Sequence, residues 1–252
     1  MGKGFDTFEA AMHMLIASQN FEIPRHIDCS AGRCFAFDCS GNVQDWFSPK
    51  VSQCEAIERL NHWFGLGLYT SDFGSLDEPF VLGPLEKTSI DSLAHKYYKG
   101  GGIYVFCMPR NESLLVHDPN GHPAMVVEKT VFDSKAAAIA LKKTQKIHHP
   151  SYHEILLAGI ELTGHNKWEG SPGLSRAARV PLQYAIRNYL CQITKVLMLI
   201  DDVAGLKPAL FREIQSLYAR MLLVNIEQIR ELIAYDHQLW KLLEQIVDGV
   251  QA

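Results

Sequence analysis

From about residue 181 onward, the chain carries apolar residues at helical spacing with little interruption. Residues 182–201, 208–224 and 226–247 each place apolar side chains three or four positions apart, which gives a helix one apolar face. Such faces are usually buried against other helices, because most helical stability in proteins comes from packing them. We therefore expect three packed helices in this part of the chain.

The preceding part alternates strand-like and helix-like segments. Residues 103–108 are β-branched and aromatic and are bounded by glycines and Pro109, which makes them the clearest strand. Asp118-Pro119-Asn120-Gly121 predicts the turn of a hairpin that joins residues 114–116 to residues 125–127. The other predicted strands are 33–38, 80–82, 85–88 and a segment that begins at Glu154, and the other predicted helices are 5–20, 49–64, 90–98 and 134–146.

These patterns place the chain in the α+β class. We expect a mixed-sheet domain at residues 1–172 and a three-helix subdomain at residues 173–252.

Composition excludes several classes of partner. The chain has 252 residues, a net charge of −4 and 47% apolar residues, which is ordinary for a soluble globular protein and argues against nucleic acid as a partner. No apolar run reaches the length of a membrane span, and the N-terminus lacks the pattern of a classical signal peptide. The six cysteines are too few for a disulfide scaffold, so we expect free thiols and a cytoplasmic location.

Residues 148–160 gather titratable side chains just before an apolar run. His148, His149, Tyr152 and His153 precede the carboxylate of Glu154, which is predicted to open a strand. A single glutamate at such a position is usually a solvated edge residue. Its relation to two upstream segments favours a functional role.

The order of three motifs resembles the catalytic subunit of the cholera- and pertussis-type ADP-ribosyltransferase toxins. That family has an early strand with an arginine, a strand that leads through a Ser/Thr motif into a helix, and a later strand followed by a catalytic glutamate. The matching segments here are Phe35-Ala36-Phe37-Asp38, residues 80–94 with Thr88 and Ser89, and residues 102–106 followed by residues 149–160.

The resemblance implies an ADP-ribosyltransferase-like domain that uses NAD as its substrate. Cleavage of the nicotinamide–ribose bond passes through an oxocarbenium-like sugar, which a carboxylate stabilises. The resemblance assigns that role to Glu154, assigns to Thr88 and Ser89 the orientation of this carboxylate, and places Tyr152 beside it. The residues expected at the cofactor are Arg33, Phe35, Thr88, Tyr69 and His149.

The chain departs from the family pattern at two positions. The family arginine aligns with Ala36, and Arg33 would point to the opposite face of a regular strand. Arginine-modifying members carry a second acid where this chain has Tyr152. The expected reaction is therefore mono-ADP-ribosylation of a host protein by a toxin or effector, with an acceptor other than arginine.

A second family offers a non-catalytic alternative. Residues 32–37 and 152–156 also resemble segments of the plast (RolB-like) T-DNA oncoproteins, which act without a classical signal peptide. On this interpretation the chain is a pseudoenzyme: a transferase-like fold that binds a host protein partner after delivery into, or expression in, a host cell.

Two further interpretations use other side chains. A cysteine hydrolase would need Cys107 or Cys34 close to His149 or His153. A metal site would draw on His148, His149, His153 and His165, of which only a subset could converge because adjacent residues on a strand point to opposite faces. We expect no metal.

Overall fold

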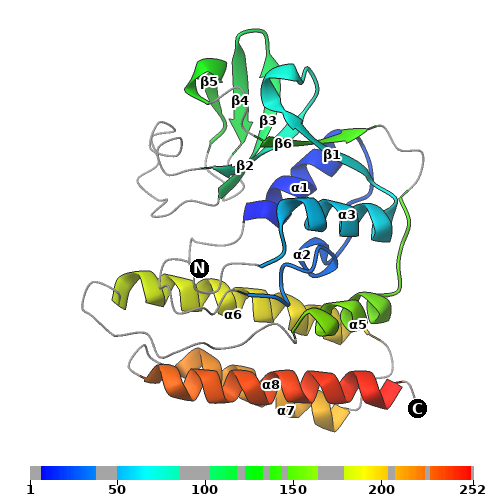
Figure 1. Ribbon diagram of the computed structural model, residues 1–252, viewed down its shortest axis with the longest axis vertical. Helices are drawn as coiled ribbons and strands as arrows, with labels where there is room; N and C mark the ends of the chain where they lie inside the picture. The colour runs from blue at the N-terminus through cyan, green and yellow to red at the C-terminus, as the bar shows by residue number, and fades with distance from the viewer. Residues whose placement is uncertain are drawn as a thin grey trace. The chain divides into compact units, whose positions relative to one another are not determined.

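The computed structural model describes residues 7–37, 50–85, 103–117, 123–132, 137–142, 147–163, 179–203, 208–224 and 228–250 (Figure 1). The chain divides into two compact units, one of residues 1–27 and 57–149 and one of residues 28–56 and 150–252. Residues 28–56 and 150–172, which the sequence places with the mixed-sheet part, group with the helical part in this division.

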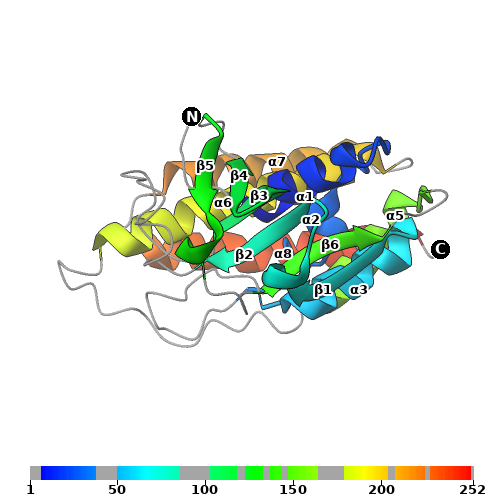
Figure 2. The ribbon, with the colours of Figure 1, turned by 90° about the horizontal axis from the view of Figure 1, so that it is seen from above.

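The first unit is built on a six-stranded sheet. Its strands lie in the order β1-β6-β2-β3-β4-β5, which Figure 2 shows from above. Every pairing among the described strands is antiparallel, where a mixed sheet is expected from the sequence. The α+β class is confirmed. The strands are β1 (Gly67–Asp72), β2 (Phe80–Leu85), β3 (Ile103–Arg110), β4 (Ser113–His117), β5 (Met125–Glu128) and β6 (Ala137–Lys142).

The two faces of this sheet are covered differently. Helix α1 (Thr7–Ser18) packs on β2, β3 and β6, with the ring of Phe8 edge-on to that of Tyr104 at 5.1 Å. Side chains alternate along a strand, so Val105 points to the other face. There it joins a cluster of buried residues that includes Phe80, Leu114 and, from outside the sheet, Phe132.

Several predicted elements are confirmed. Helix α1 lies within residues 5–20, and helix α3 (Gln53–Phe64) lies within residues 49–64. The start of α3 is capped reciprocally, since the backbone N–H of Ser52 donates to Glu55 Oε2 at 2.8 Å and that of Glu55 donates to Ser52 Oγ at 3.2 Å. Strands β4 and β5 pair as the predicted hairpin arms.

The predicted helix at residues 134–146 is wrong where the structure describes it, because residues 137–142 form strand β6. This strand lies between β1 and β2, and its residues 138–141 are buried. A strand that is buried on both faces reads as a continuous apolar run, which outweighs the helical propensity of its alanines.

The predicted strand at residues 33–38 is also wrong in its described part, which extends to Phe37. The short helix α2 (Ile27–Ser30) is followed by turns, with hydrogen bonds from Gly32 N–H to Cys29 C=O at 2.9 Å and from Phe35 N–H to Gly32 C=O at 3.2 Å. Gly32 has a φ of 81°, which an L side chain rarely adopts. Residues 27–37 are all buried, so their apolar character is not the mark of a strand.

The strand expected to begin at Glu154 is a helix, α5 (Tyr152–Thr163). Its buried residues are Ile155, Leu156, Gly159 and Ile160, which recur at helical spacing. A short apolar run does not distinguish a buried strand from a helix, and the spacing of the buried side chains decides for the helix. The predicted helix at residues 90–98 lies outside the described residues.

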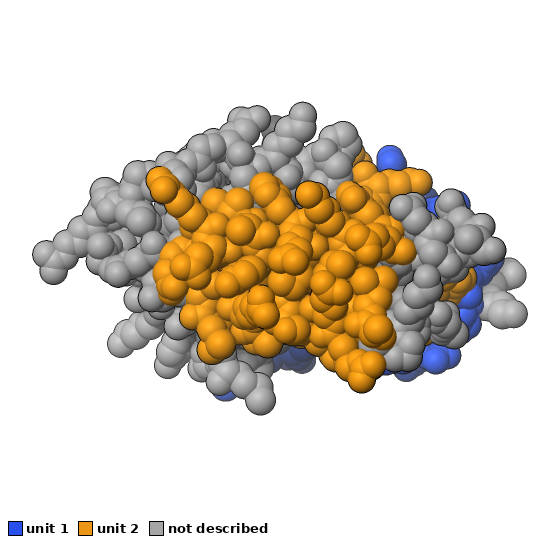
Figure 3. Space-filling view, turned by 90° about the horizontal axis from the view of Figure 1, so that it is seen from below, with its two compact units in different colours: residues 1–27, 57–149 blue, residues 28–56, 150–252 orange. Residues whose placement is uncertain are grey.

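The second unit contains three long helices and the shorter α5. They are α5, α6 (Arg179–Asp202), α7 (Pro208–Leu223) and α8 (Ile229–Val250), and the last three confirm the helices expected from the sequence. Helix α7 packs on α6 and α8, and α5 packs on the same two helices. Figure 3 shows part of the surface of this unit in orange. Within the described ranges, no helix combines the length and the apolar character needed to cross a bilayer.

Candidate functional site

Glu154 lies in the first turn of α5 with its side chain exposed to solvent. The buried face of this helix carries Ile155, Leu156, Gly159 and Ile160, and Glu161, two turns on from Glu154, is exposed as well. Residues seven apart lie on the same side of a helix. Glu154 therefore belongs to the solvent face of α5.

Arg33 and Phe35 lie in the interior of the second unit. Arg33 is 7% exposed, and its backbone N–H donates to the carbonyl of Asp28 at 3.0 Å. Phe35 is fully buried, and its ring lies so close to Gly159 that a Cβ at that glycine would overlap it. Phe35 thus packs on the buried face of α5, whereas Glu154 lies on the exposed face.

Tyr69 and His149 belong to the first unit. Tyr69 packs against the sheet core from β1, and its hydroxyl donates to Glu78 Oε1 at 2.6 Å. That hydrogen bond, with burial and the charge of Glu78, raises the pKa of Tyr69 to about 12. The side chain of His149 is exposed, with Nε2 3.8 Å from the exposed carboxylate of Glu22.

The predicted site is assembled only in small part by the described residues. Tyr152 and Glu154 share the first turn of α5, and Tyr152 is half-buried. Thr88 and Ser89 lie outside the described residues.

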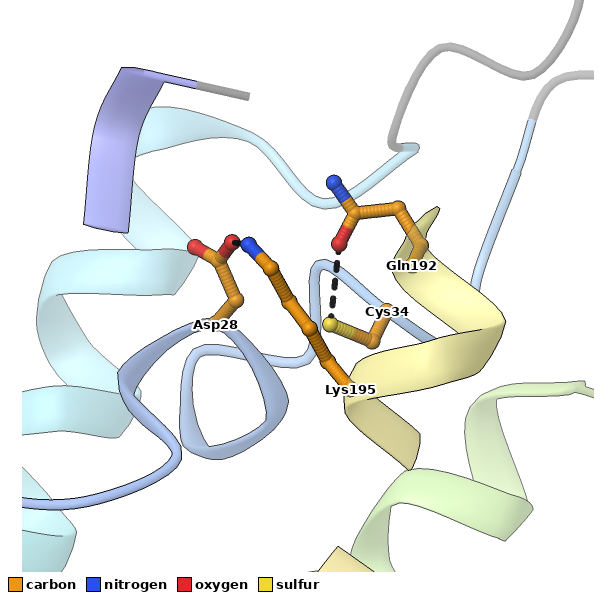
Figure 4. A network of polar contacts seen from close by, with 4 residues as sticks. All are labelled: Asp28, Cys34, Gln192 and Lys195. Atoms are coloured by element: carbon orange, nitrogen blue, oxygen red, sulfur yellow. Dashed lines mark hydrogen bonds and ion pairs between the residues drawn. The ribbon is translucent and has the colours of Figure 1, made fainter. Parts of the chain in front are cut away.

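A buried polar network occupies the second unit instead (Figure 4). The carboxylate of Asp28 is ion-paired with Lys195, and Cys34 Sγ donates to Gln192 Oε1 at 3.0 Å. Gln192 and Lys195 are three residues apart on α6, so both side chains reach residues 28–34 from the same side of that helix. The network ties this turn segment to α6.

This network has a structural role, and its thiol is not a reactive one. Burial raises the pKa of the Cys34 thiol well above its usual value, and the nearby charge of Asp28 acts in the same direction against the opposing charge of Lys195. A thiol held protonated is a poor nucleophile. Burial likewise raises the pKa of Cys107 in β3. Neither thiol supports the interpretation as a cysteine hydrolase.

A second buried network joins α6 to α8. Trp240 Nε1 donates to Asp236 Oδ1 at 3.0 Å and to the Tyr189 hydroxyl at 3.2 Å, and the Tyr189 hydroxyl in turn donates to Asp236 Oδ1. Asp236 is only 2% exposed, so these two donors stabilise a carboxylate that would otherwise be costly to bury. The rings of Phe37 and Tyr189 meet edge-on at 4.9 Å beside it.

Sequence reasoning missed both networks. Asp28 and Lys195 are 167 residues apart, and Tyr189 and Asp236 are 47 apart, so no local spacing links the partners. A weak signal exists only for Asp236 and Trp240, which stand four residues apart on the apolar side of α8. Among the described residues, no group of three or more His, Cys, Asp or Glu side chains could hold a metal ion.

An exposed apolar row crosses the outer strands of the sheet. Met108 of β3 pairs with Leu115 of β4, which pairs with Val126 of β5. Residues directly opposite each other project to the same face, so these three side chains form one row, which we call the β3–β5 row. Met108 is 37% exposed, Leu115 is half-buried and Val126 is 63% exposed. Tyr104, under α1, points to the same face as Met108, four positions away.

Comparison of the chain with protein-family models, with curated proteins and with solved structures found no match.

Proposed function

We propose that this protein is a catalytically inactive, transferase-like protein that binds a protein partner through its β3–β5 row. The exposed row carries the proposal. Large apolar side chains that adjoin on a rigid sheet and remain exposed are typical of protein interaction sites, whereas scattered exposed ones are ordinary. The order of motifs at residues 102–106 and 149–160 is the basis for relating the fold to the transferase and plast families.

The placement of the site residues supports inactivity. Cleavage of NAD needs a carboxylate at the ribose and a cation at the phosphates. Glu154 is exposed on one face of α5, while Phe35 packs on the other and Arg33 is buried. These residues therefore do not line one surface that a dinucleotide could reach.

The first experiment tests for turnover of NAD. Wild-type protein and Glu154→Gln are incubated with labelled NAD, and the release of nicotinamide and the labelling of proteins in a cell extract are measured. We expect equal background rates. Faster release or labelling by the wild type would overturn the proposal and restore the NAD-dependent transferase.

The second experiment tests the surface. Chemical cross-linking in a cell extract is compared for wild type, Val126→Lys and the matched control Leu223→Lys, whose side chain on α7 is 84% exposed. We expect a partner to be lost with Val126→Lys and retained with Leu223→Lys. Equal capture by all three proteins would show that the β3–β5 row does not bind the partner.

A further inference from the structure

Resting on the proposed binding function, we infer that the partner adds an extended segment to β5 as a seventh strand of the sheet. β5 is one of the two edges of the six-stranded sheet. An edge strand presents unpaired N–H and C=O groups, which an extended peptide of another protein can pair with.

The position of Pro109 in β3 indicates which backbone groups of β5 face outward. In an antiparallel ladder, hydrogen-bonded pairs alternate with non-bonded pairs. Pro109 has no N–H, so its pair with Leu114 is a non-bonded one and the adjacent pair of Met108 with Leu115 is a bonded one. Leu115 thus directs its backbone groups to β3, and its partner on the other side, Val126, directs its own away from β4.

A hydrogen bond of Lys129 indicates the same orientation for the backbone groups of β5. The N–H of Lys129 donates to the carbonyl of Glu112 at 3.1 Å, so Lys129 faces the inner side of the sheet. Backbone direction alternates along a strand, so Glu128 and Val126 face outward. No hydrogen bond from a described residue outside the sheet reaches the backbone of Val126.

The opposite edge of the sheet is occupied by side chains from helix α3 and from the turn that follows β1. On β1, the amide of Asn61 donates to the carbonyl of Leu68 and accepts from its N–H, both at 2.8 Å. The hydroxyl of Ser75 donates to the carbonyl of Asp72 at 2.7 Å. Only Thr70 between them keeps its outward backbone groups, which is too short a stretch for strand addition. Within the part of the chain that the structure describes, the open edge is therefore β5.

The side chains of β5 indicate the chemistry of the segment. Val126 is exposed and adjoins Leu115, so the residue opposite Val126 should be β-branched or otherwise apolar. Glu128 projects to the same face, is exposed and makes no ion pair with another described side chain. Among the described residues, its carboxylate accepts one hydrogen bond, from the Thr130 hydroxyl at 3.4 Å. A basic residue two positions from the apolar one would face this carboxylate.

A second copy of the chain fits this edge less well. If β5 paired with β5 of another copy around a two-fold axis at Val126, Val127 or Glu128, the residue opposite Glu128 would be Ala124, Val126 or Glu128 itself. None of these is basic. Charge complementarity therefore favours a different protein with a short basic and apolar extended segment.

The test uses the labelled peptide Ser-Lys-Val-Val-Val-Lys-Ser and fluorescence anisotropy. Val126→Pro removes the outward N–H without breaking a bond to β4, so the sheet should tolerate it. We expect binding to weaken at least about tenfold with Val126→Pro, and as much when the central valine of the peptide is N-methylated. Thr70→Pro, the matched change on the closed edge, should bind like the wild type.

The outcomes separate strand addition from its rivals. Equal binding by Val126→Pro, or equal binding of the N-methylated peptide, would overturn strand addition. The comparison of the two peptides uses the wild-type protein, so it remains valid even if the proline variant does not fold. If Met108→Ser weakens binding and Val126→Pro does not, the β3–β5 row binds partners without strand addition and the proposed function stands. Sedimentation that finds wild-type dimers and Val126→Pro monomers would assign the edge to a second copy and overturn the inference.

Discussion

The two units bury different kinds of side chain. In the sheet unit the cluster on one face is apolar throughout, and Thr7 is the one buried polar side chain among its described residues. In the helical unit the described interior holds five such residues: Asp28, Ser30, Arg33, Gln192 and Asp236. The sheet unit buries one polar tie, from the N–H of Tyr104 to Thr7 Oγ1, and holds another at a half-buried position, where Asn61 binds β1. The helical unit buries the carboxylates of Asp28 and Asp236 in its core.

The backbone explains this difference. A sheet defines its register through hydrogen bonds between strands, so its side chains can be apolar without loss of specificity. Helices satisfy their own backbones and can slide on apolar faces, so buried polar pairs such as Asp28 with Lys195 are well suited to define one arrangement. Each prediction below tests one side of this comparison.

The largest effect is expected in the core of the helical unit. Lys195→Met removes the ion pair between Lys195 and the buried carboxylate of Asp28, which should lower the free energy of unfolding by about 3 kcal/mol. Urea unfolding measures the change. The double variant Asp28→Asn with Lys195→Met removes both charges and should recover most of the loss. A single variant as stable as the wild type would mean that the ion pair does not hold the unit together.

A smaller effect is expected at the edge of the sheet. Asn61→Ala removes two hydrogen bonds to Leu68 at a half-buried position, which should cost about 1–2 kcal/mol in urea unfolding. It should also speed amide exchange at Leu68 while the amides of β3 remain protected. Asn61→Asp, which keeps the acceptor, is the control and should lose only part of this stability. If Asn61→Ala cost more than Lys195→Met, the comparison between the half-buried ties of the sheet unit and the core ties of the helical unit would be reversed.

The smallest effect concerns pH. The pKa of Tyr69 in the folded protein, about 12, exceeds its ordinary value of 10.0, because the neutral phenol donates to Glu78. The stabilisation is therefore complete below pH 10 and is lost as the pH rises toward 12. The difference in phenolate absorbance between wild type and Tyr69→Phe reports this titration. Glu78→Gln should move the midpoint down toward 10; an unchanged midpoint would contradict the role of Glu78.

Local signals were sufficient for part of the fold. Helices α6, α7 and α8 and the hairpin of β4 and β5 follow from periodicity and turn residues. The errors at residues 137–142 and at α5 share one cause: each is a short apolar run, and such a run suits a buried strand and a buried helix equally. Burial on both faces favours a strand at residues 137–142. In α5, the helix places Gly159 against the ring of Phe35.

The site was less accessible from sequence than the fold. The motif order assigned roles to Arg33, Phe35 and Glu154 on the assumption that each opened or occupied a strand, but Arg33 and Phe35 follow α2 in turns and Glu154 opens α5. The turns after α2 and the helix α5, rather than a strand, therefore determine where these three side chains point. The roles assigned to Thr88 and Ser89 remain predictions, because both residues lie outside the described part of the chain.

The sequence by itself determined the α+β class, the three C-terminal helices and the hairpin arms that carry Leu115 and Val126, because these depend on patterns within a few residues. Only the tertiary structure decided that Asp28 meets Lys195, that Asp236 meets Tyr189, and that, among the described strands, β5 is the edge open to pairing while Asn61 binds the other edge at β1. Those outcomes depend on contacts between distant segments and on the order of strands in the sheet, which no local spacing records.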